Sequence, residues 1–231
     1  MGDRAAKTEL FEQFARVGKA LGSGKRLELL DLLAQGERTV ETLAKTADLG
    51  VTTTSAHLQT LKQANLVSTR REGAKVHYRL AGADVAALYA LVRTVANEHL
   101  ADVEAARATY LGPGTEEVTR AELVRRAETD DVVVLDVRPR EEYEAGHIPG
   151  AMSVPVEELA GRLADIPSDQ EIVAYCRGAY CVLAHDAVRL LTSHGRRARR
   201  LSDGMLEWRL ADLPVATAPA AEGGTRQAIE D

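Results

Sequence analysis

Apolar residues in the first half of the chain recur every three or four positions, which is the spacing of amphipathic helices. The first such face comprises Leu10, Phe14, Val17 and Leu21. Further helical segments are expected at residues 27–33, 39–44, 51–64 and 83–110. Residues 66–80 instead have the pattern of two short strands that turn near Gly73. This order predicts a mainly α-helical N-terminal unit with one β-hairpin.

The pattern changes after residue 111, where Gly112-Pro113-Gly114 cannot continue a helix. Beyond it, strands are expected at residues 132–137, 171–175 and 197–201, and helices at residues 140–145 and 182–193. Alternating strands and helices predict an α/β unit with a parallel central sheet covered on both faces. We therefore predict two domains, 1–111 and 118–215, joined by a linker at 112–117 and followed by a disordered tail at 216–231.

Composition narrows the class of protein. The chain has 231 residues, of which 45% are hydrophobic, as in ordinary globular proteins. No apolar stretch approaches the roughly 18–20 residues that cross a bilayer, and two cysteines are too few for a secreted disulfide scaffold. These features predict a cytoplasmic protein with no membrane partner.

The net charge of −6 argues against nucleic-acid binding when the chain is taken as a whole. Its distribution changes that conclusion. Residues 1–111 hold 15 basic and 13 acidic residues, whereas residues 112–231 hold 14 and 22. Residues 51–80 alone hold five bases and one acid. Because a phosphate responds to the local field, this segment predicts a nucleic-acid surface.

Two short helices followed by a β-hairpin are typical of a winged helix-turn-helix, whose second helix enters the major groove of duplex DNA. The candidate base-contacting residues on the second helix are Thr52, Thr53, Thr54, Ser55, His57, Gln59 and Thr60. Their hydroxyl, amide and methyl groups can contact base edges. Arg70, Arg71 and Lys75 flank the hairpin tip, where they can meet phosphates or enter a minor groove.

Residues 25–34, 39–44, 54–61 and 66–73 resemble the ArsR/SmtB family of winged-helix regulators. The resemblance implies a homodimer, paired through its first and last helices, that binds an inverted repeat in operator DNA and usually represses transcription. The family's thiolate metal box would fall at residues 41–45, which contain no cysteine. His99 and Asp102, three residues apart on the expected last helix, are interpreted as ordinary surface residues. No metal site is predicted.

Cys176 and Cys181 bound a short loop between an expected strand and an expected helix. Backbone N–H groups converge in such a turn, and the N-terminus of a helix is positive, so the loop suits an anion. A cysteine there is expected to have a depressed pKa and to be largely thiolate. The same donors would hold a persulfide product.

The second unit resembles a single rhodanese, or sulfurtransferase, domain over about residues 117–214. The matching segments are 135–138, 141–143, 146–151, 176–181, Gly204 and Trp208. The resemblance implies that Cys176 accepts sulfur, that Asp136 and Arg138 organise the floor of the site, and that no cofactor is needed. It also implies that Arg177 attracts a small anionic sulfur donor. Glu141 is expected to pair with a basic group.

Cys181 stands where many thiosulfate-using members of that family place a basic or small residue. It is either a resolving thiol for a persulfide on Cys176 or a packing residue. The favoured hypothesis is a DNA-binding regulator, a repressor, that senses or transfers reactive sulfur through a persulfide on Cys176. The alternatives are a sulfurtransferase with an independent DNA-binding domain and a thiol-based repressor that responds to arsenic or a metal.

Overall fold

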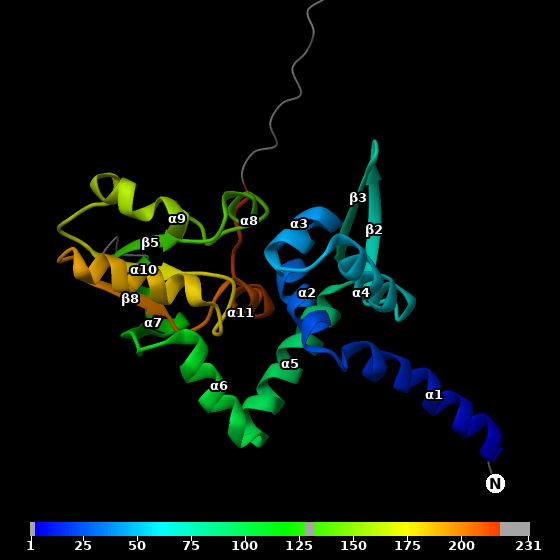
Figure 1. The fold of residues 1–231 in the computed structure, drawn as a ribbon. Coiled ribbons are helices and arrows are strands. Elements are labelled where there is room, and N and C mark those ends of the chain that lie inside the picture. Colours follow the sequence, from blue (N-terminus) through cyan, green and yellow to red (C-terminus); the bar gives the residue numbers. More distant parts are fainter. Residues whose placement is uncertain (1–2, 128–131, 218–231) are drawn as a thin grey trace, which may run out of the picture.

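A computed structural model describes residues 3–127 and 132–217, with a helical N-terminal part and an α/β C-terminal part (Figure 1). The helices of the N-terminal part are α1 (Arg4–Leu21), α2 (Gly24–Gln35), α3 (Val40–Thr46), α4 (Val51–Gln63), α5 (Ala83–His99) and α6 (Ala101–Leu111). Its strands are β1 (Arg38–Thr39), β2 (Val67–Glu72) and β3 (Lys75–Leu80). They form one antiparallel sheet in the order β1-β3-β2.

Local chemistry explains the elements that the sequence predicted. Thr39 caps α3, because its side-chain oxygen accepts from the Thr42 N–H at 3.3 Å. Gly73 turns the β2–β3 hairpin with φ +57°, in the left-handed region that favours glycine. The winged helix-turn-helix is thereby confirmed. The short strand β1 was not predicted, and it adds a third strand to the wing.

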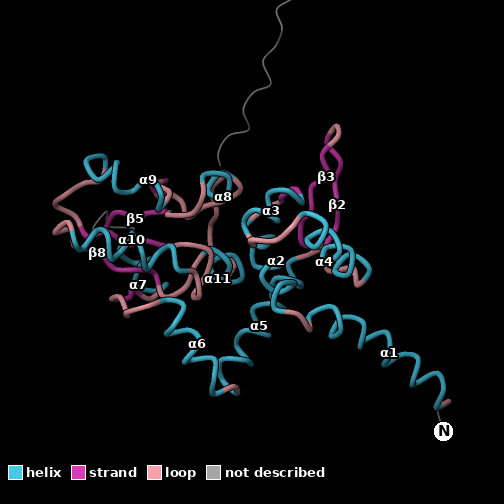
Figure 2. Tube along the Cα trace, in the orientation of Figure 1, coloured by secondary structure: helices cyan, strands magenta, loops and turns pink. Residues whose placement is uncertain are grey.

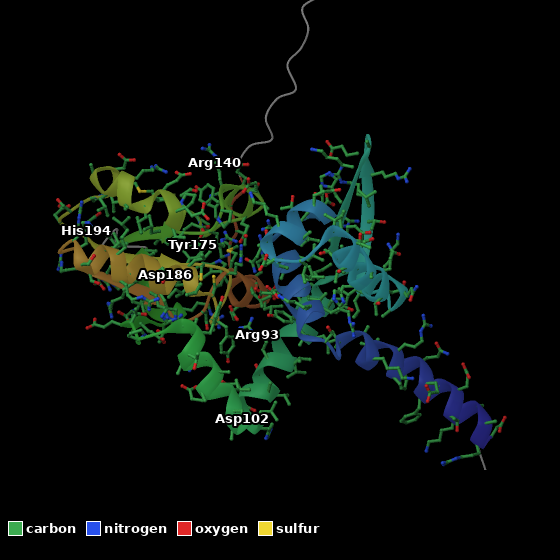
Figure 3. The ribbon with its side chains drawn as sticks, viewed as in Figure 1. Arg93, Asp102, Arg140, Tyr175, Asp186 and His194 are labelled. Atoms are coloured by element: carbon green, nitrogen blue, oxygen red, sulfur yellow. The ribbon has the colours of Figure 1, made fainter. Side chains whose placement is uncertain are left out.

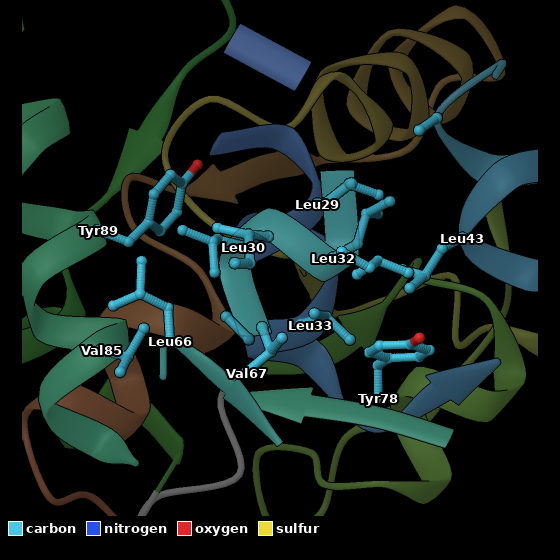
Figure 4. Close-up of a cluster of buried hydrophobic side chains, with 14 of the residues drawn as sticks. Leu29, Leu30, Leu32, Leu33, Leu43, Leu66, Val67, Tyr78, Val85 and Tyr89 are labelled. Carbon is cyan, nitrogen blue, oxygen red and sulfur yellow. The ribbon is translucent and has the colours of Figure 1, made fainter. Parts of the chain in front are cut away.

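The core of the N-terminal part gathers around α2 (Figure 4). Leu29, Leu30 and Leu33 are almost fully buried there. Most of α1 lies outside this core, and Figure 1 shows it extending away from the rest of the chain. Phe11 and Phe14 are 57% and 60% exposed. The apolar face predicted for this helix therefore lacks cover over much of its length within one chain.

The helix expected at residues 83–110 is two helices. The helix is interrupted at Leu100, whose backbone is extended with φ −108° and ψ 108°. In Figure 1, α5 and α6 form a V, with α6 reaching the α/β part. His99 and Asp102 consequently belong to different helices, α5 and α6.

The C-terminal part is built on a five-stranded parallel sheet (Figure 2). In sheet order its strands are β4 (Glu117–Val118), β8 (Ala198–Leu201), β7 (Glu171–Tyr175), β5 (Val132–Asp136) and β6 (Met152–Ser153). Its helices are α7 (Arg120–Ala127), α8 (Arg140–Glu144), α9 (Val156–Leu159), a 3₁₀ turn (Ala160–Asp165), α10 (Val182–Ser193) and α11 (Met205–Leu210).

Each face of this sheet has its own apolar layer. Ile172 and Leu135 point toward α9 and α10, where Leu191 is fully buried. Val173 belongs to the opposite layer, which includes Trp208 of α11. The predicted parallel sheet with helices on both faces is confirmed.

The two parts meet through α11, which packs against α2 and α5. Leu206 of α11 is 1% exposed and belongs to the apolar core of the winged-helix part. Residues 218–231 of the predicted tail lie outside the described residues, whereas Ala216 pairs with His147 through two backbone hydrogen bonds. The predicted domain boundaries stay predictions. Within the described ranges, no helix is both long and apolar enough to cross a membrane.

Candidate functional site

The two cysteines bracket the loop that leads from β7 into α10. Cys176 directly follows β7, and Cys181 occupies the N-cap position of α10. Both are free thiols, 1% and 9% exposed. The Cys176 Sγ donates to the Cys181 carbonyl oxygen at 3.3 Å. The fold thus places the two cysteines at the ends of one short turn between a strand and a helix, as the sequence predicted.

The protonation of this pair differs from the expectation for Cys176. Burial raises the pKa of Cys176 well above its usual range, and the neighbouring Cys181 raises it further. A hydrogen bond from the Cys176 thiol lowers the pKa of Cys181, and the charge of Arg177 acts in the same direction. The depressed pKa predicted for Cys176 was therefore wrong, since Cys181 is the sulfur that ionises first.

Asp136 and Arg138 form a sealed ion pair below the loop. Both side chains are 0% exposed, and the Arg138 Nη2 lies 2.6 Å from the Asp136 Oδ2. The Tyr175 hydroxyl also donates to that Oδ2 at 2.6 Å, and the Arg138 Nη2 donates to the Gly146 carbonyl at 2.8 Å. This geometry fits the expected supporting role of Asp136 and Arg138, because neither group is presented to solvent.

The Arg177 guanidinium forms an ion pair with a buried carboxylate. Its Nε and Nη2 lie 2.9 Å and 2.7 Å from the Oε1 of Glu142, whose side chain is fully buried. The expected role of Arg177 in attracting a donor thus has to compete with this ion pair. Glu141 is exposed, so the carboxylate that pairs with basic groups here is Glu142, one residue beyond the position predicted.

The floor of the loop leaves no space for a side chain at Gly204. A Cβ there would lie 2.6 Å from the Cys176 carbonyl oxygen and would overlap the backbone of Gly178. That carbonyl accepts from the Met205 N–H at 2.9 Å, and the Arg177 carbonyl accepts from the Leu206 N–H at 2.9 Å. The loop is therefore clamped against the start of α11.

The winged-helix part covers the outer side of the loop through Gln35, the last residue of α2. Gln35 is 0% exposed, and its Nε2 donates to the Arg177 carbonyl at 3.3 Å. Its Oε1 accepts from the Arg138 Nη1 at 3.2 Å. Gln35 was not predicted from the sequence. Its one signal was a polar side chain that ends an apolar run, which is common at helix ends.

A second contact comes from Arg93 of α5, which Figure 3 places where α5 meets the α/β part. The Arg93 Nη2 lies 2.8 Å from the Glu207 Oε1, and the guanidinium carbon lies 4.7 Å from the ring centroid of Tyr180 in the loop. Burial raises the pKa of nearby Asp31, against the opposing charges of Arg93 and Arg177. The loop is thus enclosed by charged groups from both parts.

The exposed face of α4 carries most of the predicted base-contacting residues. Those that are exposed or half-buried are Thr52, Thr53, Ser55, His57, Gln59 and Thr60. Thr54 was wrongly included, because it is 0% exposed and its Oγ1 donates to the Gly50 carbonyl at 3.1 Å. Its position lies one helical turn before buried Leu58, on the core side of α4.

The wing carries the predicted basic residues at its tip, where Arg71 and Lys75 are both exposed. Arg70 is 47% exposed and forms ion pairs with Glu37 at 2.7 Å and with Glu72 at 2.9 Å. Exposed pairs of this kind contribute little stability, so a phosphate can replace the carboxylate partner of Arg70. The wing thus offers basic groups on the same part of the chain as α4.

Within residues 3–127 and 132–217, no cluster of three or more His, Cys, Asp or Glu side chains is arranged to hold a metal ion. His185 is nearest in sequence to the cysteines, and its Nδ1 lies 3.2 Å from the Thr115 Oγ1. Burial and the charges of Arg200 and Arg189 lower the pKa of His185 to about 4. This histidine is therefore neutral at pH 7.

Known protein families match the two parts separately. Residues 23–69 match the arsR family of bacterial regulatory proteins, and residues 119–211 match the rhodanese-like domain. The HTH-type transcriptional regulator Rv0324 of Mycobacterium tuberculosis is 58% identical over 223 residues, which cover 96% of this chain and 99% of that protein. A sulfurtransferase of Allochromatium vinosum is 33% identical over 92 residues, or 39% of this chain and 84% of that protein.

A solved structure also resembles the N-terminal part. It is the homodimeric winged helix-turn-helix DNA-binding domain, fragment 1–100, of a possible ArsR-family transcriptional regulator from Mycobacterium bovis. It is 56% identical, covers 43% of this chain and 93% of that chain, and superposes with a TM-score of 0.41. Both resemblances stated from the sequence are confirmed by the family matches.

Proposed function

The chain belongs to the helix-turn-helix transcriptional regulators that join an ArsR-type DNA-binding domain to a rhodanese-like domain, and on this premise we propose that it is a homodimeric repressor controlled by reactive sulfur. In this proposal, a small anionic donor of sulfane sulfur loads Cys176. The loaded protein then releases its operator.

The observation that carries the proposal is the position of the cysteine loop. It contains two free thiols, and its outer side touches Gln35 of α2 and Arg93 of α5. A sulfurtransferase that only shared a chain with a DNA-binding domain would have no need of these contacts. Because the two parts share this surface, a change in the loop alters groups that belong to the winged helix.

The chemistry begins with the proton shared by the two sulfurs. Cys181 ionises first, and in this proposal its thiolate takes the proton of the neighbouring Cys176 thiol as attack begins. The Cys176 thiolate then attacks the outer sulfur of a persulfide donor, R–S–SH. A Cys176–S–SH persulfide forms, and R–S⁻ leaves with the proton held by Cys181 as R–SH, which restores the Cys181 thiolate. The cysteine pair thus supplies both the nucleophile and the base.

The DNA-binding surface combines the exposed face of α4 with the basic tip of the wing. Two such surfaces are needed for the inverted repeat that we expect as the operator. The exposed Phe11 and Phe14 on α1, together with Leu91 and Val95 on α5, provide apolar area for pairing with a second copy. We therefore place the dimer contact on α1 and α5.

Treatment of the reduced protein with inorganic tetrasulfide tests this function. The DNA is a duplex selected by the reduced protein from a random pool. We expect mass spectrometry to show that Cys176 has reacted, either as a persulfide or as a disulfide with Cys181, and a band shift of the same sample to show weaker binding. A coupling of ~1–3 kcal/mol corresponds to an affinity loss of roughly 5–150-fold. The Cys176→Ser variant should bind the DNA but should not respond.

Cys181→Ser is the matched variant. It lacks both the base and the thiol that could displace sulfide, so it should load sulfur more slowly than wild type but keep the Cys176 persulfide once it has formed. Release by tetrasulfide that persists unchanged in Cys176→Ser would refute the sensor. A sulfurtransferase that works independently of DNA would instead transfer sulfur from the donor to an acceptor thiol at many turnovers while DNA affinity stayed constant.

A further inference from the structure

One buried carboxylate binds both the cysteine loop and the wing. The Glu142 side chain is 0% exposed, and its Oε1 lies 2.7 Å from the Arg177 Nη2 and 2.6 Å from the Arg38 Nη2. Arg177 belongs to the loop, next to Cys176, whereas Arg38 belongs to the winged-helix part. Glu142 therefore holds two guanidinium groups from segments that lie more than a hundred residues apart in the chain.

Arg38 is part of the wing sheet. It forms β1 with Thr39, and these residues pair with Tyr78 and His77 of β3. Thr39 also caps α3, the first helix of the helix-turn-helix. A displacement of Arg38 would consequently reach both the hairpin and the helix that supports α4. The Arg38 side chain is only 8% exposed, so its interaction with Glu142 is little screened by water.

Arg177 cannot remain unaffected by chemistry at the cysteines. Its charge lowers the pKa of Cys181, which places the thiolate and the guanidinium close enough to interact. Inward movement of the loop is blocked, because a Cβ at Gly204 would already overlap its backbone. Movement is possible on the other side, where a cleft of about 740 Å³ between the two parts is lined by Arg38, Glu142 and Arg177.

We propose that Glu142 transmits the sulfur state of the loop to the DNA-binding surface by holding Arg38 in the reduced protein and releasing it after sulfur loading. This inference rests on the proposed function and specifies how that site is coupled to DNA. Glu142 and Arg38 act in it as positioning residues, because neither exchanges sulfur.

The step that triggers release is closure of a disulfide. The Cys181 thiolate attacks the inner sulfur of the Cys176 persulfide, an S–S bond forms between the two cysteines, and hydrosulfide leaves with the electron pair of the broken S–S bond. The two thiols are oxidised, and the sulfane sulfur of the donor is reduced to sulfide. The closed loop has lost the negative charge that faced Arg177.

The loss of this negative charge changes how the Glu142 carboxylate is shared between Arg177 and Arg38. In the reduced state, Arg177 divides its interaction between a thiolate and the carboxylate, and the Glu142 Oε1 is available to Arg38. After closure, Arg177 depends on Glu142 alone, and the positive charge on Arg38 is no longer balanced. Arg38 then moves into the cleft, and β1 and the start of α3 lose their anchor.

The test is the Arg38→Gln variant of the full chain, compared with wild type in the tetrasulfide experiment. Mass spectrometry should show that Arg38→Gln reacts with the donor as wild type does and reaches the same Cys176–Cys181 disulfide. Its reduced form should bind the selected duplex as weakly as loaded wild type, and loading should change that affinity less than twofold. Arg209→Gln is the matched control. It removes a different contact between the two parts, from the Arg209 Nη1 to the Ala34 carbonyl at 2.6 Å, and should respond as wild type does.

An Arg38→Gln protein that binds tightly and releases DNA on loading would overturn the inference and leave the proposed function intact. Loss of the response in wild type itself would instead refute the proposed function. If Arg38→Gln fails to fold by circular dichroism, Arg38→Lys replaces it. Lysine keeps the charge but lacks the fork that reaches Glu142, so its response to loading should be smaller than that of wild type, and an undiminished response would overturn the inference.

Discussion

Two glutamates of this protein have the same kind of partners in opposite surroundings. Glu142 pairs with Arg177 and Arg38 inside the contact between the two parts, where its side chain is 0% exposed. Glu37 pairs with Arg70 at the wing, where the two side chains are 24% and 47% exposed. Because water screens the second pair, its arginine can exchange a carboxylate for a phosphate. The first pair can change only together with the conformation around it.

The largest expected difference between these sites is in stability. Replacing Glu142 by Gln leaves two buried guanidinium groups without their counter-charge and should lower the free energy of unfolding by about 3–5 kcal/mol. The matched change Glu37→Gln should cost less than about 1 kcal/mol, because its partner is solvated. Urea unfolding of both variants measures the contrast. Similar losses of unfolding free energy in the two variants would show that burial does not make the Glu142 ion pairs contribute more to stability than the Glu37 ion pair.

A smaller effect concerns the thiols beside the buried site. The lowered pKa of Cys181 and the raised pKa of Cys176 make Cys181 the more ionised sulfur at pH 7. Because the thiolate is the form that alkylates, iodoacetamide should modify Cys181 faster than Cys176. Peptide mapping after brief alkylation of the reduced protein checks this. Faster modification of Cys176 would contradict the assignment of Cys181 as the first sulfur to ionise.

The smallest effect is expected at the wing. If Arg71 or Lys75 contacts a phosphate, its replacement by Ala should lower the slope of log affinity against log salt by about 0.9. Titrations of the selected duplex at several salt concentrations measure it. Arg140→Ala is the control, since its side chain is 80% exposed but lies on the α/β part. An unchanged slope for both wing variants would show that Arg71 and Lys75 do not contact DNA phosphates.

The sequence predicted elements whose causes are local. The helix at 182–193 was placed correctly because one apolar face repeats along it, and the hairpin was placed correctly because Gly73 supplies its turn. The cysteine loop was predicted correctly because it lies between a buried strand and a helix, both of which have clear patterns in the sequence. These features depend on neighbours within about one helical turn or one hairpin.

The contacts that couple the two parts could not be found in the same way. Gln35 and Arg177, and likewise Arg38 and Glu142, meet only after both parts have folded. Burial also decided the cysteine pKa order, because the helix N-terminus that should favour a thiolate is outweighed at Cys176 by the removal of water. The prediction that Thr54 contacts bases was wrong for a related reason. A threonine hydroxyl that donates a hydrogen bond to a carbonyl of the preceding helical turn can occupy a buried position.

Leu206 links the stability of the α/β part to that of the winged-helix part. This residue comes from the last helix of the α/β part and is buried in the apolar core of the winged helix. Melting either part would withdraw that side chain or its surroundings, so the stabilities of the two parts are linked. Heating the intact chain should therefore produce one cooperative transition rather than two.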